Sequence, residues 1–213
     1  NERGVVRWAN PYMVKYFGNQ IVVGEKLENS IPELAEIVAQ HQDDHAPTIV
    51  SWNDHQFEFF YQKRFNNLYL MDITKYERIN KRYLNERLFL GNIYLDNYVE
   101  LTQGMSDSDV SNLHNYVTSE LSKWADKFNL LLKVIDDDNY LLMGHEIDLH
   151  KLEERKFKIL DTIRENTSKM NSPVTLSVGI SYGQTDFIKL ADTAQRNLDL
   201  ALGRGGDQVV VRA

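Results

Sequence analysis

The feature that most constrains the fold is an abrupt change of sequence pattern at Thr74. Before Thr74, short aromatic and β-branched runs are separated by the dipeptides Asn-Asp at 53–54 and Asn-Asn at 66–67, which are typical of tight turns between strands. After it, apolar residues recur at the three- and four-residue spacing of a helix. The sequence therefore predicts an α+β protein with two folded regions and a helix between them.

In the first region the sequence predicts short strands and short helices. The expected strands are 4–8, 48–52, 56–62 and 68–73. The last three follow one another through tight turns, which indicates an antiparallel sheet. Asn10 and Pro11 predict the N-cap and first residue of a short helix that Gly18 ends, and Pro32 predicts the start of another.

The linking helix is predicted to run from Thr74 to Leu90, with Gly91 as its stop. Thr74 and Glu77 have the spacing of a capping box, in which each side chain accepts a hydrogen bond from a free backbone amide. Five bulky residues share one stripe of this helix: Tyr76, Ile79, Tyr83, Leu84 and Leu88. Such a stripe favours a homodimer through the linking helix, and the alternative is a helix packed on its own domain.

From residue 91 onward strands and helices alternate, which predicts a sheet covered by helices. The expected strands are 92–95, 130–135, 140–143, 174–181 and 208–211. The expected helices are 107–128, one that turns Leu149, Leu152, Leu160 and Ile163 inward, and 186–202. Strict alternation in 174–181 indicates a half-buried strand. The predicted domains are thus 1–73, 74–90 and 91–213.

Composition excludes several classes of function. The formal net charge of −7 disfavours binding to nucleic acid, whose phosphates an acidic surface repels. The absence of cysteine excludes disulfides, thiolate metal sites and cysteine nucleophiles. No apolar stretch reaches the 18 or so residues of a membrane span. Because the sequence has no initiating Met, we expect it to be a segment of a longer protein.

Several motifs resemble known families. Residues 4–10, GVVRWAN, resemble the opening of a PAS domain, and residues 72–74, Asp-Ile-Thr, resemble the motif through which PAS domains pass into a signalling helix. Residues 91–213 resemble a GGDEF domain, the fold of diguanylate cyclases, with Asp-Asp-Asp-Asn at 136–139 in the place of the signature. Residues 198–209, LDLALGRGGDQV, resemble a segment of the membrane-bound cyclic-di-AMP phosphodiesterases of the GdpP/YybT type.

This resemblance implies a regulatory segment. In that family two membrane helices precede the PAS domain, and a DHH/DHHA1 domain that uses magnesium or manganese follows the GGDEF-like domain and cleaves cyclic-di-AMP. Neither part lies in this sequence. We therefore expect a cytoplasmic segment of a protein anchored in the bacterial membrane, attached only through helices that are missing here.

The signature of a working cyclase is altered. Tyr94 stands where the family has a metal-binding carboxylate, and Asp136 and Asp137 replace two glycines that let the nucleotide approach the backbone. We therefore expect no diguanylate cyclase activity. The product-inhibition motif R-x-x-D would fall at Lys127 to Leu130, where its final Asp is missing, so a cyclic-di-GMP inhibitory site is not supported.

Two weaker sites follow from the resemblance. The family implies slow hydrolysis of ATP at the altered signature, and the candidate nucleotide-binding residues are Asp96, Asp136, Asp138 and Asn139. The alternative is a polar turn. The family also implies haem in the PAS domain, for which the candidate ligands are His41, His45 and His55. The alternative is that these are surface histidines and that any haem is held without a histidine bond.

Three functions remain open at this point. The first is a regulatory module that passes a signal from the PAS-like region to a phosphodiesterase, the second a slow ATPase, and the third a dimerisation scaffold.

Overall fold

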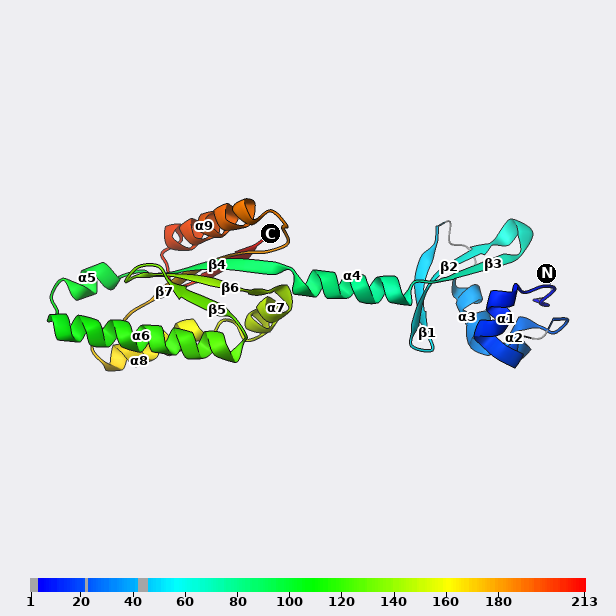
Figure 1. Cartoon of the computed structure of the whole chain (residues 1–213), viewed down its shortest axis with the longest axis horizontal. Helices are drawn as coiled ribbons and strands as arrows, with labels where there is room; N and C mark the ends of the chain where they lie inside the picture. Colours follow the sequence, from blue (N-terminus) through cyan, green and yellow to red (C-terminus); the bar gives the residue numbers. More distant parts are fainter. Residues whose placement is uncertain (1–3, 22, 42–45) are drawn as a thin grey trace. The chain divides into compact units, whose positions relative to one another are not determined.

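The computed structural model describes residues 4–21, 23–41 and 46–213, which form two compact units. The first unit runs to Lys81 and the second from Arg82 to Ala213, and each is described by itself (Figure 1).

The first unit is a three-stranded sheet with short helices. Its helices are α1 (Pro11–Phe17), η1 (Gly18–Gln20), α2 (Leu27–Ser30), α3 (Pro32–His41) and η2 (Lys63–Phe65). Its strands are β1 (Thr48–Trp52), β2 (His55–Gln62) and β3 (Asn67–Asp72). They pair in the order β1-β2-β3, antiparallel throughout, as predicted. Both predicted turns are confirmed, because Asn53, Asp54 and Asn66 have left-handed backbone with φ of 47°, 60° and 52°.

One face of this sheet carries the core of the unit. Phe57 and Phe59 of β2 pack with residues of β1, α1 and α3, and the rings of Phe17 and Trp52 stack with centroids 4.5 Å apart. The Asn10 cap is confirmed, since its Oδ1 accepts a 2.7 Å hydrogen bond from the Met13 amide. The strand expected at 4–8 is wrong, because the described residues there make a single β-bridge to the chain at residue 26.

The linking helix, α4 (Thr74–Glu86), is shorter than predicted. Strand β4 (Leu88–Leu95) begins where the helix was expected to continue to Leu90. Phe89 and Leu90 are buried and pair with β6, so ladder hydrogen bonds and burial override the helical spacing. Leu88 therefore belongs to a strand and not to the apolar stripe of the helix.

The predicted capping box is wrong. The Thr74 hydroxyl accepts a 2.9 Å hydrogen bond from the Gln56 amide of β2 instead of capping its own helix. Asp72 instead accepts a backbone amide at the start of α4, because its Oδ1 receives a 2.9 Å hydrogen bond from the Thr74 amide. The start of α4 is therefore attached to the sheet by side chains.

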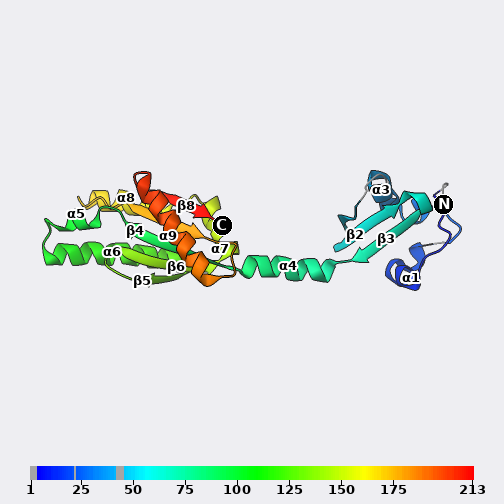
Figure 2. The same cartoon turned by 90° about the horizontal axis from the view of Figure 1, so that it is seen from above.

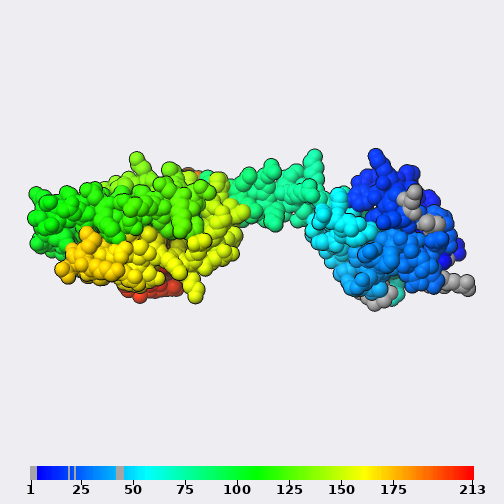
Figure 3. Space-filling view, turned by 90° about the horizontal axis from the view of Figure 1, so that it is seen from below, coloured from blue at the N-terminus to red at the C-terminus, as the bar shows by residue number. Residues whose placement is uncertain are grey.

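The second unit has a five-stranded sheet. After β4 come α5 (Tyr98–Thr102), α6 (Asp107–Lys127), β5 (Leu131–Val134), β6 (Asn139–His145), α7 (Glu146–Glu154), α8 (Ile159–Lys169), β7 (Leu176–Ser181), α9 (Phe187–Gly203) and β8 (Val209–Arg212). The strand order is β5-β6-β4-β7-β8, and only the β7–β8 pair is parallel. Helix α9 covers one face, while α6 and α8 lie side by side over the other (Figures 2 and 3).

Burial on both faces explains why β7 differs from its prediction. All six of its residues are buried, although the alternating sequence predicts one exposed face. On one side Val178 and Ile180 join the large core with α6, α7 and α8, and on the other α9 approaches so closely that a Cβ on Gly179 would lie 2.0 Å from the Leu198 amide nitrogen. The small and polar residues of β7 are therefore sites of close helix packing.

Two further elements were not predicted correctly. The helix expected to carry Leu149 through Ile163 is divided into α7 and α8, because Lys156 and Phe157 adopt positive φ of 52° and 45°. No Gly or Pro marks this break in the sequence. The short helix α5 was not predicted. Among the described residues, no helix combines the length and apolarity needed to cross a membrane.

Candidate functional site

The altered signature forms the tight turn of the β5–β6 hairpin. Ile135 and Asp136 donate their amides to the Asn139 carbonyl at 2.9 and 3.2 Å, and Asn139 donates to the Asp136 carbonyl at 3.4 Å. The Asp136 and Asp137 side chains are exposed, whereas those of Asp138 and Asn139 are half-buried. The turn thus directs two of its polar side chains toward the protein.

Tyr94 occupies the place beside them. It pairs with Asn139 across the β4–β6 ladder, and its phenol lies near the Asp138 carboxylate. Burial, with the negative charge of Asp138, raises the pKa of Tyr94. Asp138 also accepts a 2.9 Å hydrogen bond from the Asn139 amide group. A phenol thus stands beside Asp138 in place of a second carboxylate, and an amide group is bonded to one oxygen of Asp138.

Helix α6 contacts the same turn through polar side chains. A ring nitrogen of His114 lies 3.2 Å from the Asp137 carbonyl, and Thr118 lies 2.9 Å from the Tyr140 hydroxyl. The Tyr98 ring of α5 packs edge-on against His114, and burial raises the pKa values of Tyr98 and Tyr140. Sequence reasoning missed this group, although His114 and Thr118 flank the apolar stripe of α6 four residues apart.

Asp96 makes its hydrogen bonds to other parts of the chain. Its Oδ2 accepts hydrogen bonds of 2.9 Å from the Thr175 hydroxyl and from the Asp207 amide. A Cβ on Gly206 would lie only 2.7 Å from the same oxygen. Asp96 therefore holds the loop between α9 and β8 against the ends of β4 and β7, and its charge acts on the Tyr94 phenol, as that of Asp138 does.

The arrangement is suited to holding a turn rather than to holding ions. Within the described ranges, no group of three or more His, Cys, Asp or Glu side chains has the spacing of a metal site.

The candidate haem ligands are not brought together. The His41 ring lies with its centroid 5.8 Å from that of Phe59 in the core of the first unit. His55, at the start of β2, has its Nδ1 3.5 Å from the Asp72 carboxylate and 3.3 Å from the Thr74 hydroxyl. His45 lies outside the described residues.

A polar network surrounds the start of α4. Asp72 contacts His55, Thr74 and the Tyr16 hydroxyl, which donates a 3.3 Å hydrogen bond to its Oδ2. Hydrogen bonds from Thr74 lower the pKa of Asp72, while burial and the nearby Asp72 charge raise the pKa of Tyr16 to about 12. Asp72 is therefore an ionised acceptor that joins α1, β2 and α4.

A second network lies where α4 gives way to β4. Arg87 forms a 2.8 Å ion pair with Glu146 and donates a 3.2 Å hydrogen bond to the Gly183 carbonyl. Glu146, only 5% exposed, also accepts a 2.8 Å hydrogen bond from the Gly183 amide. Its own amide donates to the Arg87 carbonyl at 2.8 Å. These bonds fix residue 87 to α7 and to the loop before α9.

Known proteins share both units of this chain. A family model described as "Cyclic-di-AMP phosphodiesterase GdpP-like, GGDEF domain" matches residues 93–213, and one described as "Cyclic-di-AMP phosphodiesterase GdpP-like, PAS domain" matches residues 1–73. The cyclic-di-AMP phosphodiesterase PdeA of Listeria monocytogenes is 44% identical over 212 residues, which cover 100% of this chain. GdpP of Bacillus subtilis is 36% identical over 212 residues, again 100% of this chain.

The chain spans 32% of the length of both relatives. Among solved structures, the active GGEEF domain of a diguanylate cyclase from Vibrio cholerae is similar with a TM-score of 0.53, over 64% of this chain and 89% of that one. Its sequence identity of 11% shows a shared fold alone. The two family matches agree with the motifs at 4–10 and 198–209 and with the α+β architecture. Because one of the matches covers more than half of the sequence, the chain belongs to the GdpP-like cyclic-di-AMP phosphodiesterase family.

Proposed function

We propose that this chain is the sensory and regulatory segment of a cyclic-di-AMP phosphodiesterase. Cleavage of cyclic-di-AMP is then the task of a DHH/DHHA1 catalytic unit outside these 213 residues. Family membership supports the substrate, and the hairpin supports the absence of a catalytic task here, since a phenol, Tyr94, stands beside Asp138 in place of a second carboxylate.

The observation that carries the proposal is the attachment of α4 at both of its ends. At its start, Thr74 is bonded to β2 and to Asp72. At its end, Arg87 is bonded to Glu146 and Gly183. A helix whose two termini are each fixed to a folded unit moves with those units. A ligand that shifts β2 or β3 in the first unit therefore displaces the start of α4, and the helix carries the shift onward.

Haem is the proposed ligand of the first unit. The rings of Phe17, Trp52 and Phe59 give it the apolar surroundings that haem requires. Asp72 and Thr74 lie beside the Nδ1 of His55, so its Nε2 is the atom that would bind the iron. His41, whose ring lies beside Phe59, is the other described candidate, and a haem held without a histidine bond is the alternative.

The test of regulation uses the full-length phosphodiesterase with Thr74→Val, which keeps the shape of the side chain and removes the hydroxyl. We expect cleavage of cyclic-di-AMP without haem to stay within about twofold of the parent, and the change in rate on adding haem to fall by about fivefold, the size of a coupling free energy near 1 kcal/mol. Thr48→Val, in β1, is the matched control. An unchanged response to haem at unchanged haem affinity would contradict the proposal.

Helix α4 is also the proposed dimer contact. Tyr76, Ile79 and Tyr83 lie on one stripe and are 67%, 58% and 54% exposed in the single chain. The occupant that fits this stripe is the same stripe of a second copy, because symmetric pairing covers both at once. If the protein dimerises but no ligand of the first unit alters cleavage, the chain is a dimerisation scaffold only.

A further inference from the structure

An apolar area lies on the face of the five-stranded sheet that carries α9, near the start of β4. The register of the strands places Leu131 of β5, Met143 of β6 and Leu90 of β4 side by side on this face. Leu90 is buried against Leu190 and Ala194 of α9, whereas Leu131 is 60% exposed. Helix α9 therefore covers β4, β7 and β8 and leaves this face of β5 and β6 largely open (Figure 1).

Two further apolar side chains extend this area. Leu88 lies two residues before Leu90 on β4 and so points to the same face, where it is 36% exposed. Ile188 of α9 is 75% exposed and lies about one helical turn before Ala191, which packs with Met143 beside Leu90. We define the α9-side patch as Leu88, Leu131, Met143, Ala191 and Ile188. Contiguous apolar areas on a protein surface mark sites of interaction.

On its sheet side the patch has a basic rim. Lys133 lies two residues after Leu131 on the same face of β5, and His145 pairs with Leu88 across β6 and β4. Both Lys133 and His145 are exposed. The patch is thus apolar at its centre and polar at its edge, which is the plan of an interface with another folded protein.

The last residues of the chain lie at the same end of the sheet. Arg212 of β8 pairs with Ser181 of β7, which in turn pairs with Leu90. Arg212 is therefore about 10 Å from Leu90, two strand spacings away. The next residue, Ala213, lies beside Gly183, since a Cβ on Gly183 would be 3.4 Å from that of Ala213. Figures 1 and 2 show residue 213 and the start of α9 at the end of this unit where β4 begins.

The residues that fix the end of α4 meet at this place too. Arg87, directly before Leu88, forms an ion pair with Glu146 and donates a hydrogen bond to the Gly183 carbonyl. The Gly183 amide donates to Glu146 in turn. Gly183 therefore lies against both the Arg87 side chain and Ala213. A body that rests on the patch and is joined to Ala213 thus contacts the loop to which the end of α4 is bonded.

We propose that the α9-side patch is the docking surface for the catalytic unit of the same polypeptide. This inference rests on the proposed function, in which a catalytic unit outside these residues follows the GGDEF-like unit. The chain spans 32% of the length of its relatives, so such proteins contain enough further polypeptide to supply a folded partner. The docked face of that partner is apolar at its centre and carries carboxylates opposite Lys133 and His145.

The experiment compares hydrogen–deuterium exchange, read by mass spectrometry, in the 213-residue chain and in the full-length phosphodiesterase without haem. Docking covers β5 and the first turns of α9, so we expect amides of 131–134 and 187–191 to exchange at least about fivefold more slowly in the full-length protein. The hairpin turn at 136–137 should exchange equally in both proteins and is the internal reference.

Leu131→Asp in the full-length protein should remove this protection, because it places a charge at the centre of the apolar contact. Val99→Asp, the same change at a 54% exposed side chain of α5, is the matched control and should leave the protection intact. Both positions are exposed in the single chain, so thermal denaturation of the 213-residue variants should show an unchanged fold.

Three results would overturn this proposal. The first is equal exchange at 131–134 and 187–191 in the two proteins. The second is protection that survives Leu131→Asp or is lost equally in Val99→Asp. The third is protection that appears in the 213-residue chain as its concentration rises, which would place a second copy on the patch. Haem is absent from all of these measurements, so a protected patch in an enzyme that ignores haem would keep the docking surface and reject the regulatory function.

Discussion

At the scale of single residues, Asp72 shows how one carboxylate connects three elements. It accepts hydrogen bonds from Tyr16 of α1 and from the Thr74 amide of α4, and it lies beside His55 of β2. Residues 72–74 resemble the motif at which PAS domains pass into a helix, but their spacing predicted a cap made by Thr74 and Glu77. The sheet that competes for the Thr74 hydroxyl is not visible in local spacing. The acceptor at the start of α4 is therefore Asp72 and not Thr74.

Asp72→Ala should therefore lower the free energy of unfolding of the first unit by about 1–2 kcal/mol, the cost of removing a charged acceptor from partly buried donors. Because the folded pKa of Asp72 lies below its usual 3.8, the stabilisation is complete above that pH and is lost as pH falls through the folded pKa. Urea denaturation from pH 3 to 7 measures this, with exposed Glu25→Ala as control. A difference between Asp72→Ala and parent that stays constant down to pH 3 would contradict the assignment.

Gly179 is a second residue whose role only packing reveals. Its absent side chain lets α9 rest on β7, where an added Cβ would lie 2.0 Å from the Leu198 nitrogen and 2.4 Å from the Ala194 oxygen. Backbone atoms of a helix cannot yield to a methyl group as a flexible side chain can. Gly179→Ala should therefore destabilise the second unit by about 3 kcal/mol or more. Gly203→Ala, where a Cβ meets nothing within 4 Å, should be close to neutral in the same thermal denaturation.

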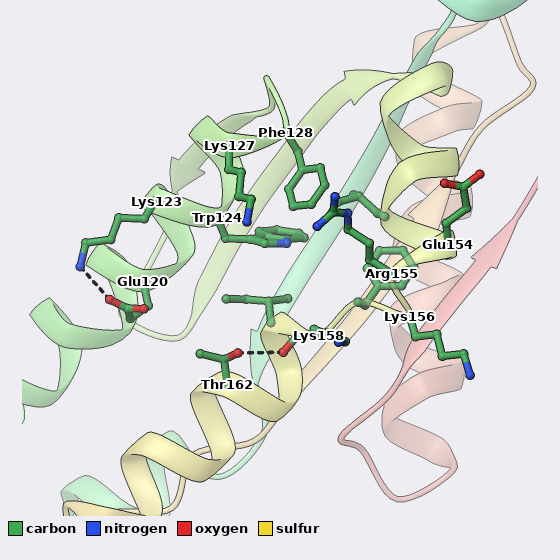
Figure 4. A pocket seen from close by; sticks show the side chains of 13 residues that line it. Glu120, Lys123, Trp124, Lys127, Phe128, Glu154, Arg155, Lys156, Lys158 and Thr162 are labelled. Carbon is green, nitrogen blue, oxygen red and sulfur yellow. Dashed lines mark hydrogen bonds and ion pairs between the residues drawn. The ribbon is translucent and has the colours of Figure 1, made fainter.

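At the scale of elements, local sequence signals predicted where most helices begin but not where some of them end. Asn10 with Pro11, Pro32 and the long α6 stripe identified their helices because caps and periodicity are local properties. The end of α4 at Glu86 and the break after Glu154 are decided by tertiary contacts: β4 must pair with two strands, and Lys156 takes a strained φ. A pocket lined by the end of α6 and by the turn between α7 and α8 joins segments far apart in sequence, so no spacing pattern could predict it (Figure 4).

The α4 stripe makes a prediction at this scale. Ile79→Asp should weaken self-association of the chain by at least about tenfold, because it places a charge where a large apolar side chain worth roughly 1.5–3 kcal/mol is buried in the proposed dimer. Asn85→Asp adds the same charge on the opposite face of α4 and is the control. Sedimentation equilibrium measures both, and a parent chain that stays monomeric at high concentration would contradict dimerisation through α4.

At the scale of the whole molecule, the proposal that catalysis belongs to a unit outside this chain can be tested. The purified chain should form no cyclic-di-GMP from GTP with magnesium or manganese, because Tyr94, Asp136 and Asp137 replace groups that bind metal and admit phosphate. It should also leave cyclic-di-AMP intact. Chromatographic detection of either product would contradict the regulatory proposal, and ATP hydrolysis abolished by Asp138→Ala would favour a slow ATPase instead.

The close seating of α9 on β7 has a consequence for how the second unit opens. The Asn197 side chain donates a 2.7 Å hydrogen bond to the Ile180 carbonyl, and β7 lies between β4 and β8 with all of its side chains buried. The amide hydrogens of 178–180 lie within the sheet, where that of Val178 is donated to the Gln208 carbonyl, and they exchange only when β7 separates from its neighbouring strands. Their exchange with deuterium should therefore be the slowest in the unit and report its global unfolding, while those of the exposed hairpin turn at 136–137 should exchange through small local fluctuations.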